Sequence, residues 1–169
     1  MNNFFLSFAY SGYSPKVPSV IASFLALIIS LFILLYFNEK TLFLAALLVS
    51  IIAIRSINKY EQNGGEHHAK HVVIDKFSGI GFALSVAPAM AIPLAQLSEL
   101  SNGFIIQALL SFVLFLHFDK EKHSLIGKIS REAKGGIGIV GDDILAGFTA
   151  GIVSSLLWQA YLQAQVFLG

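Results

Sequence analysis

Three apolar stretches of this sequence have aspartates at one end, and these carboxylates are the residues best placed to do chemistry. They are Asp75, Asp119 and the adjacent pair Asp142 and Asp143. Clustered carboxylates repel one another unless a cation lies among them. An all-oxygen set suits Mg²⁺, which proteins usually hold with one or two carboxylates plus phosphate oxygens. If the three segments meet, the sequence therefore predicts a magnesium site that handles a phosphate ester.

The aspartate pair also has a purely structural interpretation. Asp142 and Asp143 directly precede a run without charged residues from Ile144 to Gly169, so either could cap the helix that begins there. A capping aspartate accepts from free backbone N–H groups and interacts favourably with the helix dipole. Consecutive helical residues point about 100° apart, so the two need not share a role. On the sequence alone, capping and catalysis stay equally open.

A glycine-rich segment, residues 135–141, lies directly before the aspartate pair. Gly136, Gly138 and Gly141 form the spacing G-x-G-x-x-G, but a dinucleotide site needs a preceding strand. Here a basic stretch precedes and an apolar run follows, which excludes that interpretation. Free amides at a helix N-terminus can instead bind phosphate. The alternative is close packing of small residues between membrane helices, and the sequence does not decide between the two.

The composition indicates an integral membrane protein. Hydrophobic residues make up 56% and charged residues 12% of the chain, with a mean hydropathy of +0.74, whereas soluble domains carry about 25% charge. The absence of cysteine excludes disulfides, thiolate zinc sites and cysteine nucleophiles. A net charge of +1 argues against a nucleic-acid partner. We expect one domain over residues 1–169, an all-α bundle of transmembrane helices, with the first span retained.

Stretches without charged residues predict four or five spans. A span needs about 20 residues, and the candidates are Val17 to Asn38, Thr41 to Ile54, Phe77 to Ser98, Ser101 to Phe118, and Ile144 to Gly169. The second is short and is extended if Arg55 and Lys59 snorkel to the interface. The third holds Pro88 and Pro93, so we expect a helix to about Ala87, then a broken or re-entrant segment.

Lysine and arginine concentrate in residues 55–76 and 118–143, which predicts that both loops are cytoplasmic. The aspartates then face the cytoplasm. Near the same face, Lys16 could contact a phosphate or an anionic lipid head group, or serve as an interfacial anchor. His67 and His71 are spaced to share a helical face, but with His68 they lie in a charged segment that favours a solvated loop over a metal site.

Four pieces of the sequence together resemble the phosphatidylglycerophosphatase A family of bacterial inner-membrane enzymes. They are Ser11-Gly-Tyr-Ser-Pro-Lys-Val-Pro18, Val73-Ile-Asp-Lys-Phe-Ser-Gly79, Asp119, and the segment from Gly135 to Gly147 that holds the aspartate pair. The resemblance covers nearly the whole chain. It implies hydrolysis of phosphatidylglycerol phosphate to phosphatidylglycerol, with magnesium, on the cytoplasmic face of the bacterial inner membrane.

The resemblance also implies roles for individual residues. The catalytic residues would be Asp75, Asp119, Asp142 and Asp143, and magnesium would lie on Asp75, Asp142 and Asp143. The substrate, an anionic phospholipid in the membrane, would be bound by Ser14, Lys16, Lys76, Gly135, Gly136 and Gly138. The oligomeric state is not predicted.

Three positions depart from the family pattern: Lys76 stands where the family has glutamate, Leu116 where it has arginine, and Ser19-Val20 where it has Gly-Thr. A lysine beside a metal site repels magnesium and pairs with Asp75, or binds phosphate as a point charge. Loss of the arginine removes a bidentate phosphate clamp. These departures favour, as an alternative, a catalytically impaired member that binds anionic lipid or a partner protein. A small transporter ranks last because no paired half-sequence repeat is visible.

Overall fold

The fold is an all-helical bundle. The computed structural model describes residues 3–14, 17–66, 69–87, 103–121 and 135–168. Within these ranges the chain forms helices and no strand, which confirms the predicted all-α class. The elements are α1 (Asn3–Leu6), the 3-10 turn η1 (Ser11–Tyr13), α2 (Pro18–Tyr36), α3 (Glu39–Gln62), α4 (Asp75–Val86), α5 (Phe104–Glu121) and α7 (Gly136–Leu168).

Three of these helices, α2, α3 and α7, are long and apolar enough to cross a membrane. Three of the predicted four or five spans are therefore confirmed by length and composition among the described residues, and the predicted spans Phe77 to Ser98 and Ser101 to Phe118 include residues outside those ranges. Helix α5 ends in the charged run Asp119-Lys120-Glu121, and α4 is only 12 residues long. Helix α4 ends at Val86, close to the predicted end before Pro88. Residues 88–102 lie outside the described ranges, so the re-entrant segment stays a prediction.

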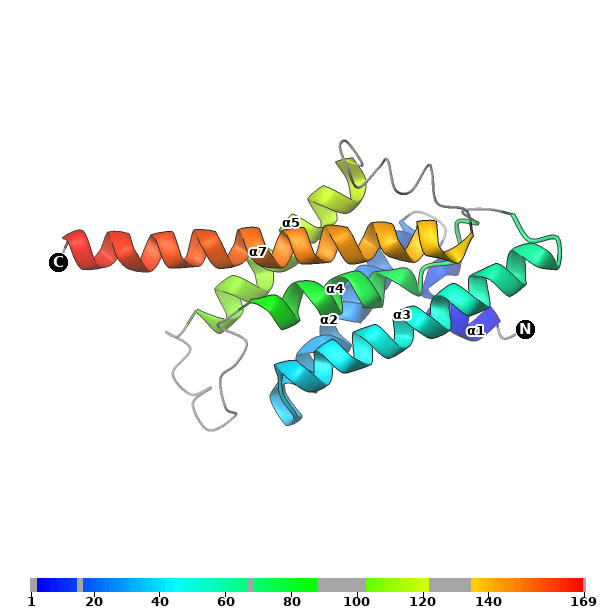
Figure 1. The fold of residues 1–169 in the computed structure, drawn as a ribbon, viewed down its shortest axis with the longest axis horizontal. Coiled ribbons are helices and arrows are strands. Elements are labelled where there is room, and N and C mark those ends of the chain that lie inside the picture. The colour runs from blue at the N-terminus through cyan, green and yellow to red at the C-terminus, as the bar shows by residue number, and fades with distance from the viewer. Residues whose placement is uncertain (1–2, 15–16, 67–68, 88–102, 122–134, 169) are drawn as a thin grey trace.

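The short helix α4 lies at the centre of the bundle (Figure 1) and packs against α2, α3, α5 and α7. Its residues from Asp75 to Leu84 are all buried. This explains how a helix with charged residues at its start can lie among apolar helices: its neighbours supply the partners that lipid could not. The first turn of α4 is thereby fixed inside the protein.

Glycines allow α4 and α7 to approach closely. A Cβ atom added to Gly147 would overlap the carbonyl oxygen of Gly79. One turn further along, a Cβ on Gly151 would lie 2.6 Å from the carbonyl oxygen of Ala83. Small residues let helix backbones pack at short distance in membrane proteins. Gly147 follows Asp143 by one helical turn, so this contact sets how near Asp143 comes to the start of α4.

Two helix boundaries differ from the prediction. Helix α3 begins after Asn38, whose side chain accepts from the Thr41 N–H at 2.8 Å, and it continues past the predicted end at Ile54 to Gln62. Helix α7 begins at Gly136 rather than at Ile144. Its start lies against α3, where a Cβ on Gly136 would come within 2.5 Å of the Ile54 carbonyl oxygen. Tertiary packing therefore overrides the poor helix propensity of the glycine-rich segment.

Candidate active site

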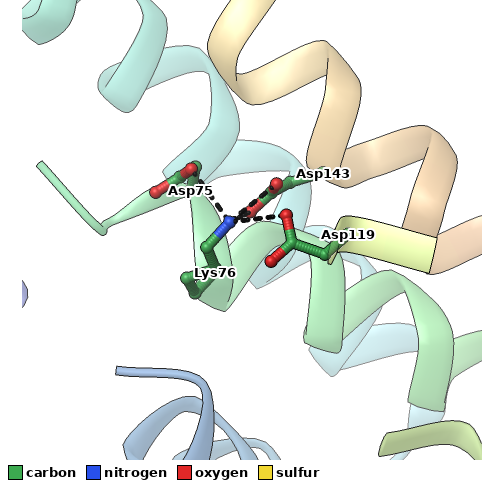
Figure 2. A network of polar contacts seen from close by, with 4 residues as sticks. All are labelled: Asp75, Lys76, Asp119 and Asp143. Atoms are coloured by element: carbon green, nitrogen blue, oxygen red, sulfur yellow. Dashed lines mark hydrogen bonds and ion pairs between the residues drawn. The ribbon is translucent and has the colours of Figure 1, made fainter. Parts of the chain in front are cut away.

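The ammonium group of Lys76 lies between carboxylates from three helices (Figure 2). Its Nζ is 2.8 and 2.9 Å from the two carboxylate oxygens of Asp143 on α7, and 2.9 Å from Asp119 Oδ1 on α5. Asp75 Oδ2, in the first turn of α4, lies 3.4 Å away. The prediction that carboxylates from three segments meet is confirmed for these aspartates, and the group at their centre is a lysine.

This cluster is almost entirely removed from solvent. Asp143 is 1% exposed, Asp75 5% and Lys76 7%, whereas the Asp119 side chain is the most accessible at 13%. Buried charges are tolerated when they are paired and hydrogen-bonded. Three carboxylates and one ammonium leave a formal charge of −2. One oxygen of Asp75, Oδ1, has no hydrogen-bond partner among the described residues.

Asp142 is also buried, at 2% exposure. Because α7 begins at Gly136, both Asp142 and Asp143 lie in its second turn rather than at its N-cap. The capping alternative is therefore wrong for both residues. Asp143 provides the contacts with Lys76, and the side chain of Asp142 leaves the helix about 100° away from it.

A cavity of about 510 Å³ opens beside the cluster. Three lysines and two aspartates line it, which gives the lining a formal charge of +1 and suits an anionic group. Its lining residues are Ser19, Val20, Ala69, Lys70, Val72, Val73, Asp75, Lys76, Leu116, Asp119, Lys120 and Ile139. Asp119 and Lys76 thus connect the buried ion pairs with an accessible space. The sequence did not single out Lys70, which lies in a segment without a recognisable motif.

All the positions that depart from the family pattern line this cavity. Ser19 and Val20 come from the start of α2, Lys76 from α4 and Leu116 from α5. They are far apart in the sequence but meet around one space. The departures that the resemblance implies therefore lie together at one site.

The cluster does not fit magnesium in its present arrangement. Mg²⁺ demands near-octahedral oxygen ligands at about 2.0–2.1 Å, and here the space between the carboxylates holds the Lys76 ammonium. Among the described residues, no group of three or more aspartate, glutamate or histidine side chains is arranged to hold a metal ion. The assignment of magnesium to Asp75, Asp142 and Asp143 stays a prediction.

The glycine-rich segment is engaged within the protein. The Gly136 N–H donates to the side-chain oxygen of Asn58 on α3 at 2.7 Å, and the Gly138 N–H donates to the Gly135 carbonyl oxygen at 3.2 Å. Gly135 itself has a φ of +72°, a backbone conformation that favours glycine. This geometry supports the helix-packing alternative over phosphate binding by these amides. Asn58 is distant in the sequence, and no local pattern identifies it as the partner of α7.

The remaining predicted residues lie away from the cluster or outside the described ranges. The Ser14 N–H donates to the Ser11 carbonyl oxygen at 3.2 Å, and Ser14 is not among the described residues that line the cavity. The His71 ring stacks on Tyr13 with a centroid distance of 5.3 Å and meets Tyr60 edge-on. His71 therefore serves ring packing. Lys16, His67 and His68 fall outside the described residues.

Comparisons with known proteins identify the family of this chain. The chain is 33% identical over 141 residues to a Bacteroides thetaiotaomicron protein described as "Putative phosphatidylinositol-3-phosphatase", and the match covers 81% of this chain and 80% of that protein. No solved structure matches the chain significantly. The family model described as phosphatidylglycerophosphatase A matches residues 4–158, which include all four aspartates and Lys76. The chain therefore belongs to the phosphatidylglycerophosphatase A family.

Proposed function

We propose that this protein is a membrane lipid phosphatase that hydrolyses phosphatidylglycerol phosphate to phosphatidylglycerol and inorganic phosphate. The observation that carries the proposal is the cavity in which Lys70, Lys76 and Lys120 lie together with Asp75 and Asp119. A phosphate monoester is a compact dianion, and lysines bind it as point charges. The placement of this site on the cytoplasmic face of a bacterial inner membrane rests on the distribution of lysine and arginine.

Asp119 is the carboxylate best placed to act on a water molecule. It lines the cavity and is the most accessible aspartate of the cluster. In the proposed reaction it takes a proton from the attacking water, whose oxygen bonds to phosphorus as the bond from phosphorus to the glycerol oxygen breaks. The glycerol oxygen then takes up the proton that Asp119 received, which returns Asp119 to its carboxylate form. Asp143 and Asp75 hold Lys76 in place.

A separate apolar groove supports a lipid substrate. It encloses about 290 Å³ and is lined entirely by apolar residues, namely Phe4, Phe5, Phe8, Ala9, Ile29, Val49, Ile74 and Phe77. Ile74 and Phe77 flank Asp75 and Lys76 in the sequence, whereas the groove and the polar cavity share no lining residue among those described. In this arrangement the phosphate enters the polar cavity while an acyl chain lies along the groove.

The described relative is named for a phosphatidylinositol phosphate, which also presents a phosphate monoester on a membrane lipid. The cavity chemistry is common to both head groups. The assay therefore includes phosphatidylinositol 3-phosphate beside phosphatidylglycerol phosphate, and we expect faster phosphate release from the latter.

One observation favours a second candidate, a family member that binds phosphorylated lipid without cleaving it. Lys76 forms ion pairs with Asp75, Asp119 and Asp143, so each carboxylate of the cluster already interacts with a cation, which makes it a weaker base. Binding of the lipid without phosphate release, at a protein concentration well above that of the lipid, would establish this candidate.

The test is phosphate release by the purified full-length protein in detergent, with magnesium and with a chelator. We expect release that falls by about 10² to 10⁴ in Asp119→Asn, the range for a positioned acid or base. Glu121→Gln is the matched control, since Glu121 lies at the same end of α5 and is exposed. No release from either lipid would contradict the proposal. Equal loss in both variants would contradict the role of Asp119.

A further inference from the structure

The position of Lys76 raises a question about the cation of this site. Its Nζ is within 3.4 Å of carboxylate oxygens from α4, α5 and α7 at the same time. An ammonium group carries three donors and no acceptor, and here three aspartates surround it. This is the central position among the carboxylates, where a bound metal ion would otherwise be needed to offset their repulsion.

We infer that Lys76 is a built-in cation that takes the place of a divalent metal between Asp75, Asp119 and Asp143. The wild-type site then holds its carboxylates together without binding a metal ion at them, and the lysines of the cavity hold the substrate phosphate. The inference deepens the proposed function, on which it rests for the location of the phosphate. The statement about metal binding does not depend on catalysis.

Charge and burial both support this inference. A divalent ion among the same oxygens would lie within a few ångströms of the ammonium, and like charges at such distances in a poorly solvated interior repel strongly. The ammonium would have to leave first. Lys76 is 7% exposed, and an ammonium that moved aside into the cavity would give up its ion pairs with Asp119 and Asp143.

The lining of the cavity supports the second half of the inference. Lys70 and Lys120 line the same space as Lys76. Three lysines therefore line one cavity together with Asp75 and Asp119, and its wall at Leu116 carries no charge. A phosphate dianion placed there meets the positive charges of Lys70 and Lys120, beside the aspartates that Lys76 holds in ion pairs, without a bridging metal ion.

The test is Mn²⁺ binding, followed by the loss of the free-ion electron paramagnetic resonance signal, on full-length protein in detergent. Mn²⁺ prefers carboxylate and water oxygens, as Mg²⁺ does. The wild type should leave the signal unchanged. Lys76→Glu adds a carboxylate and removes the ammonium. It should bind a single Mn²⁺ at least about tenfold more tightly than the wild type does, because ligand charge governs affinity for such cations. Excess Mg²⁺ should displace it.

The matched control is Lys120→Met, which removes a positive charge from the same cavity without removing an ammonium from the centre of the cluster. It should behave as the wild type. If Lys120→Met gained Mn²⁺ binding as Lys76→Glu does, the effect would be one of net charge and the inference would be overturned. Lys76→Met tests removal of the ammonium alone, and it should also gain binding.

Wild-type protein decides the inference even if the Lys76 variants do not fold. A single Mn²⁺ bound by the wild type, displaced by Mg²⁺ and lost in Asp143→Asn, would overturn the inference, and absence of binding sustains it. Failure of the proposed function is distinguishable. If the wild type neither releases phosphate nor binds Mn²⁺, the phosphatase proposal is contradicted and the built-in cation is sustained. If the wild type releases phosphate and binds Mn²⁺, the phosphatase proposal is sustained and the built-in cation is contradicted.

Discussion

Two neighbouring turns of the contact between α4 and α7 differ sharply in character. At one turn, Gly79 and Gly147 meet through their backbones, and any side chain on Gly147 would overlap the carbonyl oxygen of Gly79. At the preceding turn, Lys76 and Asp143 meet through charges at 2.8 Å. The first contact depends on shape and the second on the balance of charge.

This difference explains how the site can change while the bundle is kept. The glycine contact fixes the distance between the helices whatever charges lie one turn away. The charged turn needs only that its carboxylates face a cation, and an ammonium or a metal ion satisfies that need. Lys76 and Leu116, which depart from the family pattern, line the cavity. Neither substitution changes Gly79 or Gly147, the glycines of the helix contact.

Removal of the central cation should produce the largest loss of stability. Lys76→Met leaves three carboxylates without their common partner, and breaking a buried ion pair in this way costs about 3–5 kcal/mol. The free energy of unfolding in detergent, measured without divalent ions, gives the value. Lys120→Met, an exposed change, should stay within about 0.5 kcal/mol of the wild type. A small effect for Lys76→Met would show that the cluster does not depend on its ammonium.

A methyl group at the glycine contact should have the next largest effect. Gly147→Ala forces α4 and α7 apart, and overpacking of this kind costs about 1–3 kcal/mol. Because Asp143 lies one turn away, phosphate release should fall as well. Unfolding and phosphate release are measured on the same preparation. Unchanged stability and phosphate release in Gly147→Ala would show that the close contact between α4 and α7 is not required for either property.

The smallest effect, of opposite sign, is expected at another glycine of the same helix. Apart from its chain neighbours and the backbone of its own helix, no atom of the described residues lies within 4 Å of a Cβ placed on Gly141. Gly141→Ala should therefore stabilise the protein by about 0.5–1 kcal/mol, since glycine is a poor residue inside a helix. The free energies of unfolding of Gly141→Ala and Gly147→Ala, measured under the same conditions, provide the comparison. If Gly141→Ala destabilised the protein as much as Gly147→Ala, glycine would be required throughout α7. The claim that the contact with Gly79 specifically requires glycine would then be contradicted.

The sequence predicted the helical class and the meeting of Asp75, Asp119 and Asp143, because apolar runs and the carboxylates at their ends are local patterns. It placed the start of α7 too late, since glycines are poor helix formers and only the contact with Ile54 and Asn58 on α3 fixes that start. That misplacement left the capping alternative open for Asp142 and Asp143.

The role of Lys76 at the centre of the cluster could not be predicted in full. Its pairing with Asp75 follows from their adjacency, but the contacts with Asp119 and Asp143 depend on how α4, α5 and α7 cross. The same holds for the cavity, to which Lys70 and Leu116 come from separate segments. Charge type is visible in a sequence, whereas the convergence of charges is a property of packing.

The most direct test of this account is phosphate release from phosphatidylglycerol phosphate by wild-type protein in excess chelator. The account predicts release at the same rate with chelator as with magnesium, and loss of that release in Asp119→Asn. Release that occurs only with magnesium would contradict the built-in cation, and absence of release under both conditions would contradict the phosphatase.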